Sequence, residues 1–226
     1  MDGNEGVPLA AERDFPPRSA AGALTVVTDA SGEDGLGGYA FDAADPHHVI
    51  LVAAVWPPDV QRALARSAEG SAAEPGLSMP AAETFGQWAV AAAAARLLGT
   101  TPTTVTAVGD CAPAAGAINA ASSGNAQMRR VVRGGRELCE QWLAVAIPRE
   151  WNLDADWLSH PSNLPTLVGE AEAAGMRASV APVPDECWRG LREAIAEGLV
   201  AVPGRKRRRS GRGDGPTVEA TAGDIP

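Results

Sequence analysis

The first apolar runs of the chain have the length and composition of β-strands. Three such runs lie at residues 24–28, 37–41 and 48–56, and each ends at a turn signal of Asp, Gly or Pro. β-Branched and aromatic residues favour strands, whereas Asp, Gly and Pro favour turns. Because the connections between the runs are short, the pattern predicts an antiparallel meander of three strands.

Further along the chain, the apolar residues take up helical spacing. A helix is predicted over 81–98, with Ser78 as a candidate N-cap, Pro80 in the first turn and Gly99 at its end. Further helices are predicted over 113–121, 125–142 and 151–159, with strands over 103–108 and 143–147 between them. Gly134 and Gly135 are a candidate break in the helix over 125–142.

The order of these elements predicts an α/β fold. A helix that connects two strands of one sheet makes those strands parallel. We therefore expect a mixed five-stranded sheet, three antiparallel strands followed by two parallel ones, flanked by helices. Two more helices, over 164–174 and 186–199, predict a helical C-terminal appendage packed on this domain.

Composition divides the chain into four parts. Residues 1–20 and 203–226 lack a hydrophobic period, so we expect disordered tails there, the second of them basic. The predicted sheet domain covers 21–160, and the helical C-terminal extension covers 161–202.

Charge and cysteine usage exclude several classes of protein. The net charge of −9 excludes a plain basic nucleic-acid-binding protein. The three cysteines show no CxxC spacing, which favours a reducing compartment and disfavours a zinc site. The longest apolar stretch, 88–98, is far short of the roughly 20 residues that span a bilayer. With an acidic N-terminus unlike a secretory signal, we expect an intracellular protein without a membrane partner.

Four carboxylates fall at the boundaries of the predicted elements. They follow the first and fourth strands and begin the helices after the third and fifth strands: Asp29, Asp110, Glu83 and Asp156. The carboxyl ends of neighbouring parallel strands converge on one edge of a sheet, so we expect these groups to meet. Like charges in one place raise one another's pKa, and a hard cation such as Mg²⁺ relieves that repulsion.

Each of these acids also has a structural alternative. Asp29 could be a turn residue, and Asp110 could cap the helix that follows it. Glu83 and Asp156 could serve the dipole of a first helical turn, with Asn152 as a cap before Asp156. The pattern of four acids in this order of strands and helices favours the metal site.

The segments that carry these acids resemble the ribonuclease H (RNase H) domains of reverse transcriptases from gypsy-type and DIRS-type retrotransposons. The resemblance covers about residues 22–160, and it rests on Thr28-Asp-Ala-Ser31, Gly35-Leu-Gly-Gly-Tyr39, Ala82-Glu83, Val108-Gly-Asp110 and Asn152-Leu-Asp-Ala-Asp-Trp-Leu-Ser159. The last motif is the most specific of them.

This resemblance implies an RNase H-like fold and a two-metal-ion endonuclease that hydrolyses the RNA strand of RNA–DNA hybrids. By position, the catalytic residues and metal ligands would be Asp29, Glu83, Asp110 and Asp156. The ions would be two Mg²⁺, with Mn²⁺ as a substitute. A reverse transcriptase domain is an implied partner, either in a longer polyprotein or in the ancestor of a free-standing derivative.

The chain departs from this family pattern before its last aspartate. Many members carry a histidine there that is thought to assist product release, whereas this chain has residues 147–151 without one, and His160 follows the motif. Two alternatives stay open. One is a non-catalytic RNase H-like module that binds nucleic acid or connects domains, and the other is a transposase or resolvase that cuts DNA on the same fold.

Several residues are candidates for contacts with a hybrid. Half of the eight arginines within residues 20–160 lie in one predicted helix: Arg129, Arg130, Arg133 and Arg136. The spacing of three of them on one helical face suits phosphate contacts, with a solvated surface as the alternative. Candidates for sugar contacts are Ser31, Asn119 and Ser122.

Two further features belong to the sequence as a whole. The basic run 205–209 is of the type read by nuclear import receptors or bound to nucleic acid without specificity, with a charged disordered tail as the alternative. The large apolar side chains of Trp88, Trp142, Trp151 and Trp157 are expected in the core.

Overall fold

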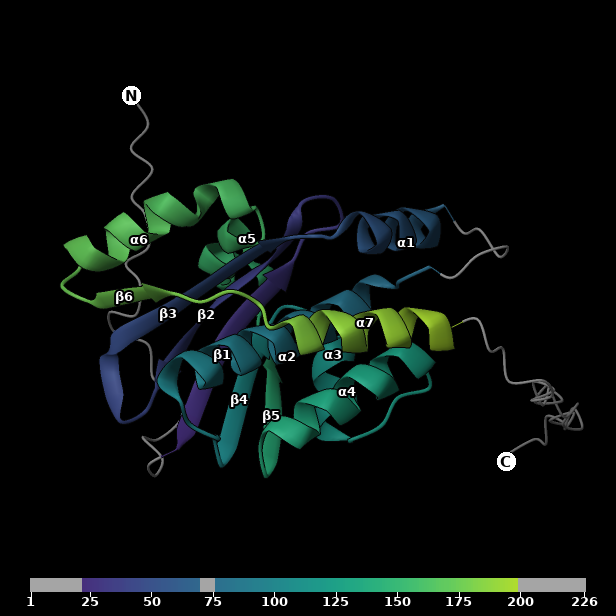
Figure 1. Ribbon diagram of the computed structural model, residues 1–226, viewed down its shortest axis with the longest axis horizontal. Helices are drawn as coiled ribbons and strands as arrows, with labels where there is room; N and C mark the ends of the chain where they lie inside the picture. Colours follow the sequence, from purple (N-terminus) through teal and green to yellow (C-terminus); the bar gives the residue numbers. More distant parts are fainter. Residues whose placement is uncertain (1–21, 70–75, 199–226) are drawn as a thin grey trace, which may run out of the picture.

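A computed structural model of the chain describes residues 22–69 and 76–198, and these form a mixed sheet flanked by helices on both faces (Figure 1). The six strands lie in the order β5-β4-β1-β2-β3-β6. Their bounds are β1 Ala23–Ala30, β2 Gly35–Asp42, β3 Asp45–Val55, β4 Thr104–Gly109, β5 Gln141–Ala146 and β6 Arg177–Val180. Both predicted tails, 1–20 and 203–226, lie outside the described residues.

The pairing of the strands confirms the predicted mixed topology. Strands β1, β2 and β3 are antiparallel neighbours, and β4 and β5 are parallel to β1 on its other side. The parallel arrangement follows from the helices that connect β3 to β4 and β4 to β5. The sheet is the one expected of an RNase H-like fold, with one strand more than predicted.

The sixth strand corrects the expectation of a purely helical extension after residue 160. Strand β6 pairs in parallel with β3, from His48 opposite Arg177 to Leu51 opposite Val180. Its four residues are half-exposed or exposed, so they show no alternation that a sequence pattern could reveal. The strand is formed by its backbone hydrogen bonds to β3, and it covers an edge of β3 that would otherwise be unpaired.

A layer of helices covers one face of the sheet. It contains α2 Met79–Leu98, α3 Ala112–Asn119, α4 Ala126–Leu138 and α7 Asp185–Glu197, with α1 Pro58–Ala68 beside them (Figure 1). Helix α2 is buried almost all round, because its many small alanines let the sheet, α4 and α7 pack closely against it. Helix α1 is not predicted by the sequence pattern, because Pro57 and Pro58 indicate a turn, whereas Pro58 in fact begins the helix.

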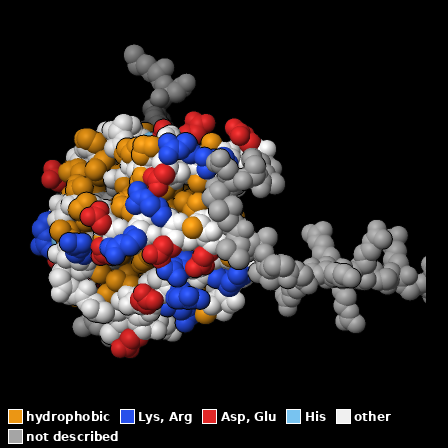
Figure 2. All heavy atoms as spheres, turned by 45° about the vertical axis from the view of Figure 1, so that its right-hand side comes forward, with side chains coloured by type: hydrophobic (Ala, Val, Ile, Leu, Met, Phe, Trp, Pro, Cys, Tyr) orange, Lys and Arg blue, Asp and Glu red, His pale blue; other side chains and the backbone are white. Residues whose placement is uncertain are grey.

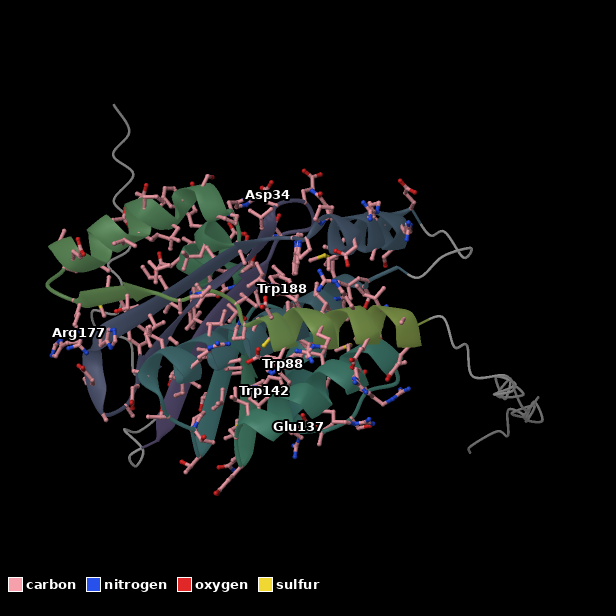
Figure 3. The ribbon with its side chains drawn as sticks, viewed as in Figure 1. Asp34, Trp88, Glu137, Trp142, Arg177 and Trp188 are labelled. Atoms are coloured by element: carbon pink, nitrogen blue, oxygen red, sulfur yellow. The ribbon has the colours of Figure 1, made fainter. Side chains whose placement is uncertain are left out.

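Aromatic side chains join this layer together. Phe85 of α2 lies at the centre, with ring centroids 5.9 Å from Trp88 and 5.2 Å from Trp188 of α7. Trp56, at the end of β3, contacts both Phe85 and Trp188. The labelled tryptophans of this cluster lie around α7 in Figure 3. Helix α7 is therefore part of the main core.

The opposite face of the sheet is covered by two helices, α5 Leu153–Leu158 and α6 Leu164–Ala173 (Figure 1). Leu158 and Leu167 pack with Val49 and Leu51 of β3, and Ala155 packs with Val27 of β1. The predicted helix over 151–159 is in fact a 3₁₀ turn, Arg149–Trp151, followed by α5.

The predicted helix over 125–142 ends early, and its glycines do not break it. Helix α4 ends at Leu138, and Trp142 lies in β5 with its indole buried. A Cβ on Gly135 would lie 1.9 Å from Cζ3 of Trp142. Gly135 therefore makes room for the indole of Trp142, which packs directly on the helix backbone.

The structure corrects the expectation for two of the tryptophans. The prediction that Trp151 and Trp157 belong to the core is wrong, because they are 57 % and 45 % exposed. No helix within residues 22–69 and 76–198 is long and apolar enough to cross a membrane.

Candidate metal centre

The first candidate ligand, Asp29, projects from the central strand of the sheet. It is the next-to-last residue of β1, pairs with Gly37 of β2 and is only 7 % exposed. Asp29 is therefore a strand residue, and the alternative that it serves a turn is removed.

The second and third candidate ligands come from β4 and α2. Asp110 follows the last residue of β4, and the N-cap of the next helix is Cys111, so Asp110 is not a cap. The helix dipole favours acidic residues in the first turn of a helix. Helix α2 begins at Met79, so Glu83 lies beyond that turn. The structural alternatives for these two acids are also removed.

These three carboxylates meet at one edge of the sheet. One oxygen each of Asp29, Glu83 and Asp110 lies within 4.8 Å of the others. The convergence follows from the topology, because β1 and β4 are parallel neighbours that end at the same edge and α2 crosses over them. Three of the four predicted ligands are thus brought together.

Burial and mutual repulsion hold protons on this cluster. Burial raises the pKa of Glu83 to about 9, and the charges of Asp29 and Asp110 add to the rise. Burial likewise raises the pKa of Asp29 to about 6, with contributions from Asp110 and Asp156. The backbone N–H of Ala30 bonds to Glu83 and opposes the rise of its pKa. Without a cation, the three groups cannot all be ionised at neutral pH.

The fourth candidate, Asp156, lies beside this cluster without belonging to its closest group. Its charge contributes to the raised pKa of Asp29, while its own carboxylate accepts a hydrogen bond from Arg149 at 3.2 Å. Arg149 is exposed, and its pKa is raised by the bond to Asp156 and by the charges of Asp156, Asp110 and Asp29. The positive charge of Arg149 therefore interacts with the negative charges of the site.

Residues of the last motif make contacts that the sequence did not indicate. Asn152 stands at the N-cap position of α5, but its side chain does not cap that helix. It donates instead to the carbonyl of Thr28 at 3.1 Å. Ser159 is fully buried, and its interaction with the Asp29 carboxyl lowers the pKa of that group. No local pattern could have revealed these contacts, because both join segments far apart in the sequence.

The arginines of α4 lie on the helical face of the molecule. Arg130 is paired with Glu193 and Glu197 of α7, and Arg129 donates to the carbonyl of Ser123. Arg133 and Arg136 are exposed. The view of Figure 2, which brings the side of α1, α4 and α7 forward, shows basic and acidic side chains interspersed. Their contact with phosphates stays a prediction.

The candidate sugar contacts have different surroundings. The Ser31 hydroxyl accepts hydrogen bonds from the backbone N–H groups of Glu33 and Asp34, so it stabilises the β1–β2 turn. The Asn119 amide both donates to and accepts from the backbone of Ala144 in β5. Both groups of Asn119 thus hold α3 against the sheet, whereas Ser122 is exposed.

The histidine that follows the last motif contacts the β1–β2 turn. His160, which follows α5, lies 2.5 Å from Asp34 of the β1–β2 turn, and Asp34 is labelled in Figure 3. The basic run 205–209 lies outside the described residues.

Comparison with known proteins gives a likeness of structure alone. No family model and no curated protein matches the chain. The chain is similar to RNase H1 of the halophilic archaeon Halobacterium salinarum, with 17 % identity and a TM-score of 0.41 over 62 % of this chain and 97 % of that one. It is also similar to the N-terminal RNase H domain of a Mycobacterium tuberculosis protein fused to maltose-binding protein, with 16 % identity and a TM-score of 0.35 over 60 % and 95 %.

Proposed function

We propose that this protein is a metal-dependent ribonuclease H, which hydrolyses the RNA strand of RNA–DNA hybrids. The observation that supports this function is the cluster of Asp29, Glu83 and Asp110, whose oxygens lie within 4.8 Å of one another. It stands at the edge of the sheet where the resemblance of the motifs implies a catalytic centre.

The chemistry of the cluster suits a hard divalent cation. Mg²⁺ and Mn²⁺ prefer oxygen ligands, and Mg²⁺ keeps several waters beside substrate phosphates. Asp29, Glu83 and Asp110 would hold the cation, and Asp156 would serve as the fourth ligand, in a site for two ions. Bound divalent ions supply a Lewis acid for the scissile phosphate and lower the pKa of a bound water.

The protein's own side chains would orient these ligands and the substrate. The N–H of Ala30 bonds to Glu83, and the Ser159 side chain interacts with the Asp29 carboxyl. Arg149, exposed beside Asp156, offers a positive charge to a phosphodiester that approaches the acidic site. Arg133 and Arg136 on α4 would contact the backbone of the hybrid farther from the scissile bond.

The context of the activity is also part of the proposal. The Asn152–Ser159 motif supports an origin in a retroelement reverse transcriptase, with a polymerase domain as the partner. The expected location is inside the cell, with nuclear import through the basic run 205–209.

Cleavage of a labelled hybrid tests this function. The full chain is incubated with an RNA–DNA hybrid labelled in its RNA strand, in Mg²⁺ or Mn²⁺, beside single-stranded RNA and duplex DNA. We expect cleavage of the RNA in the hybrid, loss of cleavage in Asp29→Asn, and normal cleavage in Glu33→Gln, which makes the same change of charge on the exposed turn.

Other results would replace the proposal with one of its alternatives. Binding of the hybrid without cleavage in either metal would identify a non-catalytic module. Cleavage of duplex DNA in place of the hybrid would identify an enzyme of the transposase or resolvase type. Cleavage of the hybrid that survives Asp29→Asn would refute the assignment of the site.

A further inference from the structure

We propose that Asn152 and Ser159 are positioning residues, which grip β1 on both sides of the Thr28–Asp29 peptide and so hold α5, with Asp156, beside the carboxylate cluster. This inference rests on the proposed metal site. In this proposal, Asn152 and Ser159 support metal binding by holding other groups in place, whereas Asp156 is the one residue of their motif that would bind the metal.

The contact of Asn152 is directed at β1. Asn152 is 1 % exposed, and its Nδ2 donates to the carbonyl of Thr28 at 3.1 Å. Thr28 lies one residue beyond the last pair of the β1–β4 ladder, Val27 with Val108. A buried carbonyl at the end of a ladder needs a donor, and Asn152 supplies one. The Asn152 side chain makes no capping hydrogen bond to α5, so its contact with β1 does not serve to cap that helix.

The contact of Ser159 is directed at the neighbouring residue of β1. The hydroxyl of Ser159 donates to the carbonyl of Asp156 at 2.7 Å and lies within hydrogen-bonding reach of the Asp29 carboxylate. One fully buried oxygen therefore touches the backbone of one predicted ligand and the side chain of another. A shift of Ser159 would move both.

A third contact, at Gly37 of β2, sets the distance between α5 and the sheet. A Cβ on Gly37 would lie 2.0 Å from the carbonyl carbon of Leu158, so the end of α5 rests directly on the backbone of β2. Gly37 is the residue of β2 that pairs with Asp29. The helix is thus seated on the strand next to Asp29 and tied at both ends to β1, which leaves Asp156 a narrow range of positions.

Metal binding distinguishes a positioning role from a merely structural one. Groups that orient metal ligands typically change metal affinity or activity by about 10- to 100-fold when they are removed. Mn²⁺ binding to the full chain is measured directly by electron paramagnetic resonance, and thermal unfolding is measured without metal. The variants are Asn152→Ala, Ser159→Ala and the control Ser179→Ala, which removes the bond between Ser179 and His48 in β6 and β3.

We expect the Kd for Mn²⁺ to rise by about 10-fold or more in Asn152→Ala and Ser159→Ala. Ser179→Ala should lower the unfolding temperature without changing that Kd. If Asn152→Ala does not fold, Ser159→Ala decides alone, since it removes a single oxygen atom. A folded Ser159→Ala with a Kd within twofold of the wild type would overturn the inference.

The same experiment separates this inference from the proposed function. A wild-type chain that binds no Mn²⁺ would contradict the metal site itself, and the positioning role with it. A wild-type chain that binds Mn²⁺ and cleaves the hybrid, with variants that bind equally well, would contradict the positioning role only.

Discussion

One carboxylate oxygen of Asp29, near the end of β1, lies within 4.8 Å of one of Glu83 in helix α2, and the charge of Asp29 adds to the rise that burial causes in the pKa of Glu83. The repulsion acts on the folded state, because the unfolded chain keeps these groups apart. The cluster therefore links three properties of the molecule, namely its stability, its response to pH and its affinity for cations.

The stability of the metal-free protein should fall as the pH rises. The pKa values of Asp29 and Glu83, about 6 and about 9, are raised above their ordinary values near 4. Between about pH 4 and these values, the folded state binds more protons than the unfolded state, so the free energy of unfolding decreases with pH. A cation that replaces the protons removes this loss.

Thermal unfolding at two pH values measures that effect. We expect Mg²⁺ or Mn²⁺ to raise the unfolding temperature by several degrees at pH 8 and much less at pH 5. A metal at about 100 times its Kd contributes about 2.7 kcal/mol. An equal rise at both pH values would show that the metal binds away from the two acids.

Removal of the charge at Arg149 should act on metal and substrate in opposite directions. Arg149→Ala removes a cation that lies close to the carboxylates, so Mn²⁺ should bind more tightly, whereas the KM for the hybrid should rise. Because solvent screens an exposed charge, each change should be about fivefold at most. Arg149→Lys keeps the charge and should show smaller changes. Weaker Mn²⁺ binding in Arg149→Ala would instead indicate that Arg149 holds Asp156 in place.

Gly37 should tolerate no side chain. In Gly37→Ala, the added Cβ would collide with the backbone of Leu158, so α5 must move away from β2. We expect a loss of about 1–3 kcal/mol in the free energy of unfolding together with a fall in cleavage. Gly116→Ala in α3 is the matched control, because nothing lies within 4 Å of its added Cβ. If Gly37→Ala keeps full stability and cleavage, α5 is not seated as described.

Helix α7 should prove to be part of the cooperative core. Leu191 is fully buried in the main hydrophobic cluster, so Leu191→Ala should lower the free energy of unfolding by about 2–5 kcal/mol in urea titrations. Arg189→Ala, an exposed change on the same helix, should alter it by less than about 0.5 kcal/mol. An unfolding curve with two transitions, in which only the first responds to Leu191→Ala, would show that the C-terminal extension unfolds by itself.

The sequence predicted the strands best where their local composition suits the place that they take in the sheet. The runs around Val26, Tyr39 and Ile50 are rich in β-branched or aromatic residues and lie in central strands. Asp29 and Asp110 could be placed together because the ends of parallel strands converge whatever the details of packing. Their burial, and hence the size of the pKa shifts, depends on the side chains of other elements.

The remaining features depend on contacts between distant segments. Strand β6 forms by pairing with the edge of β3. Trp142 lies in β5 and not in the predicted helix, and its indole packs against Gly135. Trp151 and Trp157 were expected in the core, but Trp151 lies in a 3₁₀ turn without buried residues, and α5 buries only Ala155 and Leu158. The bond from Asn152 to Thr28 joins two ends of the domain, so no local spacing could indicate it.

Anomalous diffraction from a crystal soaked in Mn²⁺ tests the metal site most directly. The three carboxylates of Asp29, Glu83 and Asp110 should surround an anomalous peak, with Asp156 at its edge, and Asp29→Asn should abolish or weaken that peak. Millimolar Mn²⁺ that leaves the cluster without a peak, or carboxylates that lie far apart in the crystal, would contradict the assignment of this edge of the sheet as a metal-dependent catalytic centre.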